Sequence, residues 1–343
     1  MRTSLRGSID SSGALRPDVP EVTVVEAVNQ ALALEMGRDE RVVVIGEDVG
    51  KSGGVFRATD GLYGKYGAGR VIDTPLSEGA IAGAAIGLAL AGWVPVAEIQ
   101  FLGFAHNGFN QVVDQLARVR YRSAGRFSAQ VTIRAPYGGG VRAPELHSDG
   151  FEAHFAHAPG LKVVAASTPY DIKGLLLASI RDPDPVLFLE PLRGYRQVRG
   201  EVPEGDFEVE IGKARIAREG SDVTLVAWSG AVQLALQAAE DAQAQGISVE
   251  VIDLRTLVPL DAATLAASVT KTGRAVVLQE ASLTAGFGAE VVATIQEEAF
   301  FSLQAPIRRV ASPDVPYPVQ MLEEQYLPNP ERVLEAIVAT TRE

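Results

Sequence analysis

Short runs of β-branched residues alternate with alanine-rich stretches along this chain, and the alternation occurs in two separate series. Such alternation predicts parallel sheets with helices on both faces. A polar stretch at about residues 193–207, which carries Gly and Pro, separates the two series. The 343 residues are enough for two domains of ordinary size. We therefore expect two doubly wound α/β domains, whose ligand sites lie at the carboxyl ends of the strands.

The periodicity also predicts where the elements lie. In the first series we expect strands and helices in this order: strand 42–46, helix 79–92, strands 94–99, 131–134 and 162–165, helix 169–181, strand 186–189. In the second we expect strand 223–228, helix 231–245, strand 249–253, helix 261–269, strand 275–279, helix 286–299 and strand 307–310. The predicted organisation is a flexible tail (1–20), a first domain (21–195), a linker (196–207) and a second domain (208–343).

Composition excludes several classes of function. The formal net charge of −12 argues against a general nucleic-acid binder, which needs a basic face to neutralise phosphates, and against electrostatic docking onto anionic lipid. The chain has no cysteine, which excludes disulfides, a thiol nucleophile, Cys-ligated zinc and iron–sulfur clusters. Residues 79–97 carry no charge and approach the length of a membrane span. Their Gly and Ala content and Pro95 favour a buried helix that runs into a strand instead.

Short nucleotide-binding and hydrolase motifs are incomplete. The P-loop pattern fails because Ile45 stands where its first Gly is needed, and no GxSxG nucleophile elbow occurs. His147 follows a flexible loop, Gly138 to Gly140, and a His there can act as acid, base or oxyanion donor. His154 and His157 lie three residues apart, but we identify no further metal ligands, so solvated or packed imidazoles are favoured.

The start of the helix at 79–92 allows two interpretations. Glu78 directly precedes it, and a carboxylate there is favourable as a helix cap beside the positive end of the dipole. It also follows a predicted loop, from which a side chain can face a cleft. Gly79, Gly83 and Gly87 recur every four residues and form one smooth stripe. Internal packing and a contact between subunits explain this stripe equally well.

A series of motifs runs in one order through residues 22–340. They are GEDVG (46–50), GGVFRAT (53–59), RVIDTPLSE (70–78), VAEIQF (96–101), RYRSAGRF (120–127), TIRAPYGGG (132–140), ELHSD (145–149), PGLKVV (159–164), SIRDPDP (179–185), VIDLRTLVPLD (251–261) and TAGFGAE (284–290). This series resembles the beta subunit of the thiamine-diphosphate-dependent decarboxylating component of 2-oxo acid dehydrogenase complexes. The resemblance implies a pyrimidine-binding domain followed by a transketolase-type C-terminal domain.

The resemblance also assigns roles to individual residues. Glu78 would hydrogen-bond the ring nitrogen of the cofactor's aminopyrimidine, and Phe104 would pack on that ring. His147 would assist substrate binding and acyl transfer to the lipoyl group. Three more residues would line the cofactor pocket: Glu47, Leu76 and Gln100. A structural potassium ion would be bound at five positions: Val131, Thr132, Ser179, Asp182 and Asp184.

The expected partners follow from a missing motif. The GDG…N motif, which binds magnesium and pyrophosphate in thiamine enzymes, does not occur in this chain, and in the family it lies on a separate alpha subunit. The resemblance therefore implies half an active site in a complex of two alpha and two beta chains, with magnesium held by alpha. The C-terminal domain would dock the lipoyl-transacylase core.

The substrate and the location are less narrowly defined. A small 2-oxo acid is expected, with pyruvate favoured over a branched-chain 2-oxo acid because Phe104 resembles the pyruvate members. Without a clear presequence, a bacterial cytoplasm is expected rather than a mitochondrial matrix. Two alternatives remain: a standalone transketolase-like enzyme, and a non-catalytic scaffold subunit.

Overall fold

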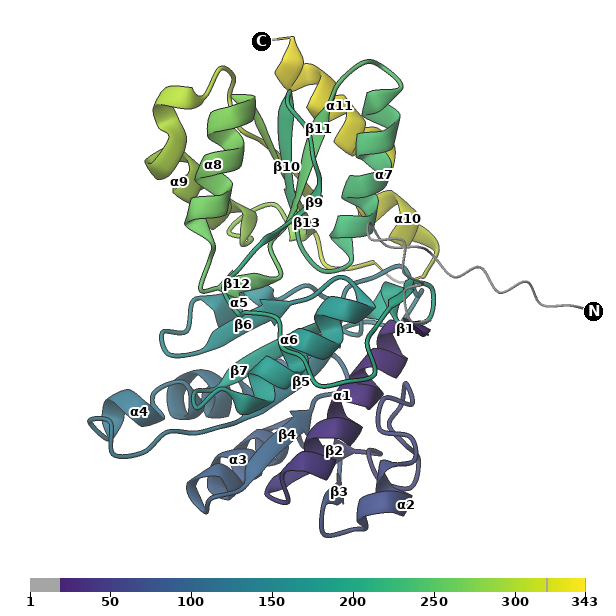
Figure 1. Ribbon diagram of the computed structural model, residues 1–343, viewed down its shortest axis with the longest axis vertical. Helices are drawn as coiled ribbons and strands as arrows, with labels where there is room; N and C mark the ends of the chain where they lie inside the picture. The colour runs from purple at the N-terminus through teal and green to yellow at the C-terminus, as the bar shows by residue number, and fades with distance from the viewer. Residues whose placement is uncertain (1–18, 319, 343) are drawn as a thin grey trace, which may run out of the picture.

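Two twisted sheets, each with helices on both faces, form two lobes stacked along the long axis of the molecule (Figure 1). The computed structural model describes residues 19–318 and 320–342. The lower lobe in Figure 1 comes mainly from the N-terminal part of the chain and the upper lobe from the C-terminal part. The expected pair of doubly wound α/β units is confirmed.

The first sheet has seven strands in the order β12-β6-β7-β5-β4-β2-β3. Its strands are β2 (Val42–Glu47), β3 (Val71–Thr74), β4 (Val94–Glu98), β5 (Thr132–Tyr137), β6 (Lys162–Ala165), β7 (Val186–Pro191) and β12 (Thr256–Val258). All neighbours are parallel except β12 and β6, which are antiparallel. Every residue of β4, β5 and β7 is buried, as expected for parallel strands covered on both faces.

Helices of the first lobe cover this sheet; α marks an α-helix, and η marks a short 3₁₀ or π helix. They are α1 (Val24–Arg38), α2 (Leu62–Tyr66), α3 (Glu78–Leu90), η1 (Leu102–Gly108), η2 (Asn110–Leu116), α4 (Val119–Arg122), α5 (Glu152–Ala156), α6 (Pro169–Arg181) and η3 (Leu192–Gly194). The sequence defines where the two long helices α1 and α6 begin. Thr23 and Glu26 form a capping box at α1, and Thr168 caps α6 just before its Pro169.

The second sheet has five strands in the order β14-β13-β10-β11-β9, of which only β9 is antiparallel to its neighbour. The strands are β9 (Arg215–Arg218), β10 (Val223–Ala227), β11 (Val249–Asp253), β13 (Ala275–Ser282) and β14 (Arg308–Ser312). The helices and turns are α7 (Ala231–Gln243), α8 (Ala262–Thr272), α9 (Gly288–Ala299), η4 (Phe300–Ser302), η5 (Gln320–Leu322), α10 (Glu323–Tyr326) and α11 (Pro330–Thr341).

The predicted elements all appear, with ends shifted by a few residues, but several elements were not predicted. Helix α6 has the predicted bounds, whereas α1, α11 and most edge strands were not predicted. The stretch expected to be a linker contains strand β8 (Arg199–Glu201), which pairs with β1 (Glu21–Thr23). Strand β12 lies in the predicted second domain but joins the first sheet. Residues 1–18 of the predicted tail lie outside the described residues, and the domain boundaries stay a prediction.

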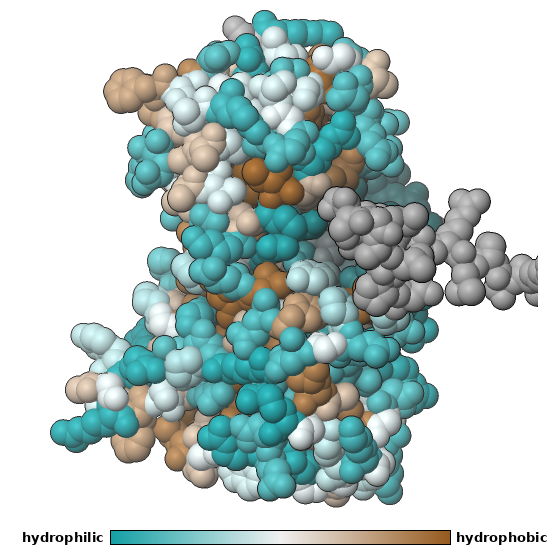
Figure 2. Space-filling view, in the orientation of Figure 1, coloured by the Kyte–Doolittle hydropathy of each residue, from teal (hydrophilic) through white to brown (hydrophobic). Residues whose placement is uncertain are grey.

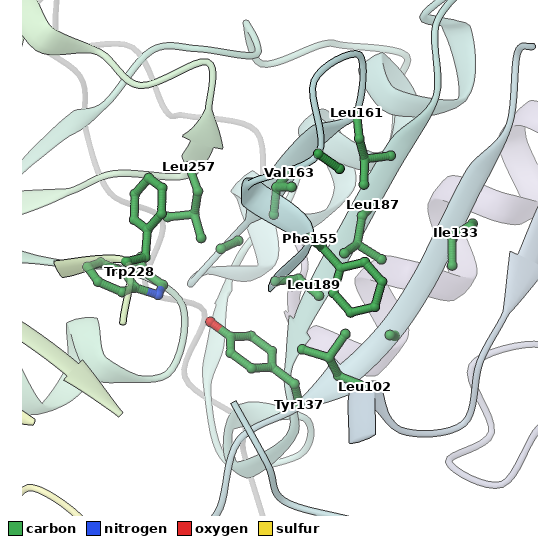
Figure 3. Close-up of a cluster of buried hydrophobic side chains, with 14 of the residues drawn as sticks. Leu102, Ile133, Tyr137, Phe155, Leu161, Val163, Leu187, Leu189, Trp228 and Leu257 are labelled. Atoms are coloured by element: carbon green, nitrogen blue, oxygen red, sulfur yellow. The ribbon is translucent and has the colours of Figure 1, made fainter. Parts of the chain in front are cut away.

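One hydrophobic core continues from the first lobe into the second. We call the contact between the two lobes the seam. Figure 3 shows Trp228 and Leu257 on one side of the cluster and Phe155, Leu187 and Leu189 on the other. All five side chains are at most 2% exposed. Because these apolar residues share one core, the two lobes are expected to behave as one folded body.

The outer surface is mixed in character. On the face shown in Figure 2, hydrophilic residues predominate and hydrophobic residues form small separate patches. Within the described residues, no helix combines the length and the hydropathy needed to cross a membrane.

Candidate active site

Two carboxylates and an amide gather at the carboxyl-terminal edge of the first sheet. Glu47 ends β2, Gln100 follows β4, and Glu78 begins α3 just after β3. Because β2 is parallel to both β3 and β4, their carboxyl ends meet at the same edge. Burial raises the pKa of Glu47, and the nearby charges of Asp48 and Glu78 raise it further, against a hydrogen bond from Gln100. These residues therefore interact directly at one edge.

Glu78 occupies the first turn of α3 and does not act as the helix cap. The cap position belongs to Ser77, whose side chain makes no capping hydrogen bond. Instead, the Asn107 side-chain amide donates to the Glu78 carboxylate at 3.1 Å. The neighbouring Leu76 side chain is 80% exposed. The carboxylate is therefore held by η1 on one side, while the side next to Leu76 is open.

Aromatic rings form a wall beside these polar groups. The ring of His147 lies 4.8 Å from the ring of Phe104 and 4.5 Å from that of Phe101, in edge-to-face arrangements. A Cβ atom at Gly103 would lie 1.9 Å from the Leu146 carbonyl oxygen, so only glycine lets the His147 loop approach η1 this closely. The Nδ1 atom of His147 lies 2.9 Å from the carbonyl oxygen of Glu145, which leaves Nε2 for other partners.

A fully buried ionic network supports this edge, and it was not predicted. Arg134 on β5 donates to Glu98 on β4 at 2.6 Å and to Glu190 on β7 at 2.7 Å. The Tyr195 hydroxyl donates to Glu190. Burial alone would lower the pKa of Arg134, but its two carboxylate partners hold it above its usual value. The only available signal was the presence of charged residues inside apolar strands.

Three comparisons place this geometry among known proteins. The model of the transketolase pyrimidine-binding domain matches residues 20–197, and that of the transketolase C-terminal domain matches residues 212–333. The chain is 53% identical over 320 residues to the pyruvate dehydrogenase E1 component subunit beta of Staphylococcus epidermidis, covering 93% of this chain and 98% of the relative. It is 52% identical over 315 residues to the Bacillus subtilis protein of the same name, covering 92% and 97%.

The chain belongs to the beta subunits of 2-oxo acid dehydrogenases. The family expected from the motifs is thereby confirmed. In this beta subunit, the matched pyrimidine-binding segment contains all the polar and aromatic residues described above. A split-gene transketolase, solved as an inactive beta4 tetramer, has a TM-score of 0.75 at 24% identity and covers 94% of this chain and 98% of its own. That likeness shows the shared fold.

The glycine stripe of this beta subunit is only partly explained by internal packing. A Cβ at Gly79 would lie 3.1 Å from the Asn107 carbonyl oxygen, so this glycine permits the contact between α3 and η1. At Gly87 a Cβ would meet no atom within 4 Å. Internal packing therefore accounts for the first glycine and leaves the last one open to a partner.

The positions predicted to bind potassium lie together at the opposite, amino-terminal edge of the first sheet. The Val186 amide donates to the Val131 carbonyl at 3.0 Å, and the Asp182 amide donates to the Ser179 carbonyl at 3.3 Å. The first contact joins the start of β7 to the residue before β5, and the second closes the C-terminal end of α6. The full set is Val131, Thr132, Ser179, Asp182 and Asp184.

The carboxylates of this set already have cationic partners. Lys162 pairs with Asp182 at 2.6 Å, and Arg120 pairs with Asp184 at 2.6 Å. The buried Thr132 hydroxyl has no hydrogen-bond partner among the described residues. As arranged, the two carboxylates do not fit as potassium ligands, so potassium binding stays a prediction.

The remaining histidines do not form a metal centre. The Nε2 atom of His106 lies 3.0 Å from Nδ1 of His154, and both rings pack against Phe151, whereas His157 follows the end of α5. Within residues 19–318 and 320–342, no group of three or more His, Asp or Glu side chains is placed to hold a metal ion. The expectation of packed or solvated imidazoles agrees with this arrangement.

Proposed function

We propose that this chain is the beta subunit of a pyruvate dehydrogenase and that, with an alpha subunit, it catalyses oxidative decarboxylation of pyruvate and reductive acylation of a lipoyl group. The convergence of Glu78, Phe104 and His147 at one edge of the first sheet carries this proposal. The names of the most similar relatives favour pyruvate. Phe104 favours it too, because some branched-chain members have Tyr at this position.

The residues at this edge fit the pyrimidine half of thiamine diphosphate. A planar ring with ring nitrogens and an amino group needs an aromatic face and hydrogen-bonding groups at its rim. Phe104 offers the face, while Glu78, Gln100 and Glu47 offer acceptors and a donor. Leu76 adds an apolar side chain on the open side. When bound, the cofactor would supply the electron sink for loss of carbon dioxide.

Each side chain of this beta subunit then has a defined task. The Glu78 carboxylate would hold a proton at the ring nitrogen, and Asn107 keeps that carboxylate oriented by its hydrogen bond. Phe104 would hold the ring plane and exclude water from one face. His147, with Nδ1 directed at the Glu145 carbonyl, would present Nε2 to the substrate and assist transfer of the acyl group.

The alpha subunit is proposed to complete the site. Leu76 is 80% exposed in this chain, so the candidate site is open to solvent on that side. The absence of the magnesium-pyrophosphate motif from the sequence supports a division in which alpha holds magnesium and pyrophosphate. The assembly would contain two alpha and two beta chains, dock the lipoyl-transacylase core through the second lobe, and reside in a bacterial cytoplasm.

The test is dye-coupled oxidative decarboxylation by this chain co-purified with its alpha subunit, in the presence of thiamine diphosphate and magnesium. Pyruvate is compared with 3-methyl-2-oxobutanoate. We expect kcat/KM to be higher for pyruvate, since discrimination between substrates is expressed in that ratio. The chain without alpha should give no turnover.

Each other outcome has a distinct meaning. A higher ratio for the branched substrate would replace pyruvate and remove the diagnostic value of Phe104. Turnover by the chain without alpha would favour a standalone transketolase-like enzyme. A folded, cofactor-loaded assembly that turns over neither substrate would favour the scaffold alternative.

A further inference from the structure

The loop that leads from β5 to His147 is held at its beginning by the second lobe. We call residues 138–147 the glycine loop. Its backbone has positive φ angles at Gly138 (91°), Gly140 (84°), Arg142 (54°) and Leu146 (67°). Positive φ is costly for Arg and Leu, so these conformations persist only where surrounding contacts maintain them.

Carboxylates from the second lobe accept hydrogen bonds from the loop's backbone amides. Glu280 on β13 accepts from the amide of Gly139. Glu323, at the start of α10, accepts from the amides of Gly140 at 2.9 Å and Arg142 at 3.0 Å. Glu323 is only 2% exposed, so its carboxylate has few alternative partners in water. Hydrogen bonds from the amides of Gly139, Gly140 and Arg142 thus bind the loop to the C-terminal part of the chain.

Tyr317 completes this arrangement and leaves no room for a side chain on the loop. Its hydroxyl donates to Glu323 at 2.6 Å. A Cβ at Gly139 would lie 1.8 Å from that hydroxyl, so the loop is packed directly against the tyrosine. Charge-assisted hydrogen bonds from two amides and one hydroxyl converge on Glu323, and such bonds are stronger than neutral ones. We call Glu280, Tyr317 and Glu323 the clamp.

The other end of the same loop meets the candidate active site. Leu146 lies against Gly103 of η1, and the next residue, His147, contacts the rings of Phe101 and Phe104. Only three residues lie between Arg142, which the clamp holds, and Leu146. Because this connection is so short, a displacement of the clamped end should also displace His147.

We propose that Glu323 is a positioning residue for the reaction: the clamp on the second lobe fixes the glycine loop and thereby places His147 against Phe104. This inference rests on the proposed function, since it assumes that His147 acts on the substrate or the acyl group. The second lobe would then contribute to the active site of this beta subunit through the backbone of the loop.

The experiment compares Glu323→Ala with Glu324→Ala in the chain assembled with its alpha subunit. Glu324 is a matched control on the same helix: it pairs with the Arg142 side chain at 2.7 Å, but it is 79% exposed. Amide hydrogen exchange of residues 140–147 is measured together with steady-state kinetics. Both substitutions are also made in a His147→Ala background. Glu323→Gln, which keeps one acceptor oxygen, serves if the alanine variant does not fold.

We expect Glu323→Ala to accelerate exchange in the loop and to lower kcat/KM by roughly tenfold, because small displacements of reacting groups have large kinetic costs. The same change should add less than about a twofold loss once His147 is Ala, since residues that act through one group are non-additive. Glu323→Gln should fall between the wild type and Glu323→Ala, and Glu324→Ala should match the wild type in both measurements.

Two results would overturn the inference: unchanged exchange at Gly140 and Arg142, or an equal loss of activity with and without His147. The second result would mean that Glu323 supports folding in general. Failure of the proposed function gives a different pattern. If His147→Ala leaves kcat/KM unchanged, the role assigned to His147 is wrong, and so is the claim that Glu323 acts on the reaction through it. The exchange data still decide whether Glu323 holds the loop.

Discussion

The carboxyl edge of the first sheet and the seam between the lobes both collect carboxylates, but they satisfy them differently. At the edge, the side chain of Asn107 is the partner given to Glu78, and the adjacent Leu76 is exposed. At the seam, Glu280 and Glu323 accept backbone amides from a loop more than 130 residues away in the sequence. The edge is open to a partner, whereas these two seam carboxylates have their partners within the chain.

This difference predicts whether a substitution first changes activity or first changes stability. Substitution of a residue that gains its contacts only in a complex should reduce activity and leave the stability of the isolated chain nearly unchanged. Residues whose partners all lie within the chain should affect stability first. The comparison therefore predicts which measurement responds to a substitution at each region.

The largest effect is expected at the edge, from Glu78→Gln. This substitution removes the charge but keeps an oxygen able to accept from Asn107. We expect kcat of the assembled enzyme to fall by about 10²- to 10³-fold, the usual contribution of a positioned acid or base. The free energy of unfolding should change by less than about 0.5 kcal/mol. Activity within twofold of the wild type would remove Glu78 from the mechanism. Glu40→Gln, on an exposed turn, is the control.

The seam should respond to Leu257→Ala with a loss of stability. Leu257 is 1% exposed and belongs to the core that joins the two lobes (Figure 3). Truncation of a buried leucine costs about 2–5 kcal/mol, from lost burial and the cavity that remains. Urea unfolding, followed by far-UV circular dichroism and tryptophan fluorescence, measures this loss. Leu90→Ala, at a side chain 48% exposed, should cost under about 0.5 kcal/mol.

The shape of that unfolding curve gives a second result. Trp93 precedes β4 in the first lobe, and Trp228 lies at the seam. If one core joins the lobes, fluorescence and circular dichroism should report a single coincident transition in the wild type. Two separated transitions would mean that the seam is a weak contact between independent domains.

The fold was largely predictable because several of its strands are short apolar runs rich in β-branched residues, as in β2 and β10. The sequence alternation specified β10, β11 and α6 closely. The short edge strands were missed for a physical reason: β8 and β12 have three residues each, and their pairing comes from tertiary contacts rather than from local preference. Position in the chain also gave a wrong assignment for β12, because this strand belongs to the second series in the sequence but pairs with β6 in the first sheet.

The candidate site was predictable only where a motif named it. The roles of Glu78 and His147 came from the resemblance. Position alone favoured a helix cap for Glu78 and left His147 open as an acid, a base or an oxyanion donor. Contacts distant in sequence left no local pattern. The amide of Asn107 reaches Glu78 across 29 positions, and Glu323 reaches Gly140 across 183. No periodicity in one chain encodes such pairs, so the clamp required the structure.

A smaller effect, dependent on pH, is expected at the seam from Glu280→Gln. Loss of hydration, with repulsion from Glu152 and Glu323, raises the pKa of Glu280 to about 7, against the Gly139 amide and the charge of Arg193. The folded state thus keeps a proton that the unfolded chain releases near pH 4.5. Its contribution to stability is therefore lost as the pH rises from about 4.5 to about 7.

The glutamine variant carries no such proton, so it should escape this loss. At pH 5 its free energy of unfolding should be nearly the same as that of the wild type. At pH 8 it should be higher, by at most about 3 kcal/mol. Melting temperatures of both proteins across this pH range provide the measurement. Glu297→Gln, exposed on α9, should show no pH-dependent difference. A stability difference that stays constant with pH would contradict a proton held by Glu280.

The smallest effect on the isolated chain is expected at the edge, from Leu76→Ala. Because the Leu76 side chain is 80% exposed, its truncation removes little buried area, and the free energy of unfolding should change by under about 0.5 kcal/mol. Assembly with alpha and cofactor would bury this side chain, and full burial of a leucine contributes about 1.5–3 kcal/mol. The substitution should therefore weaken cofactor binding to the assembly by roughly 10- to 100-fold, measured by fluorescence titration. Equal cofactor affinity of the wild-type and Leu76→Ala assemblies would mean that Leu76 stays exposed after assembly. The contrast between the edge and the seam would then not arise from a partner missing beside Leu76.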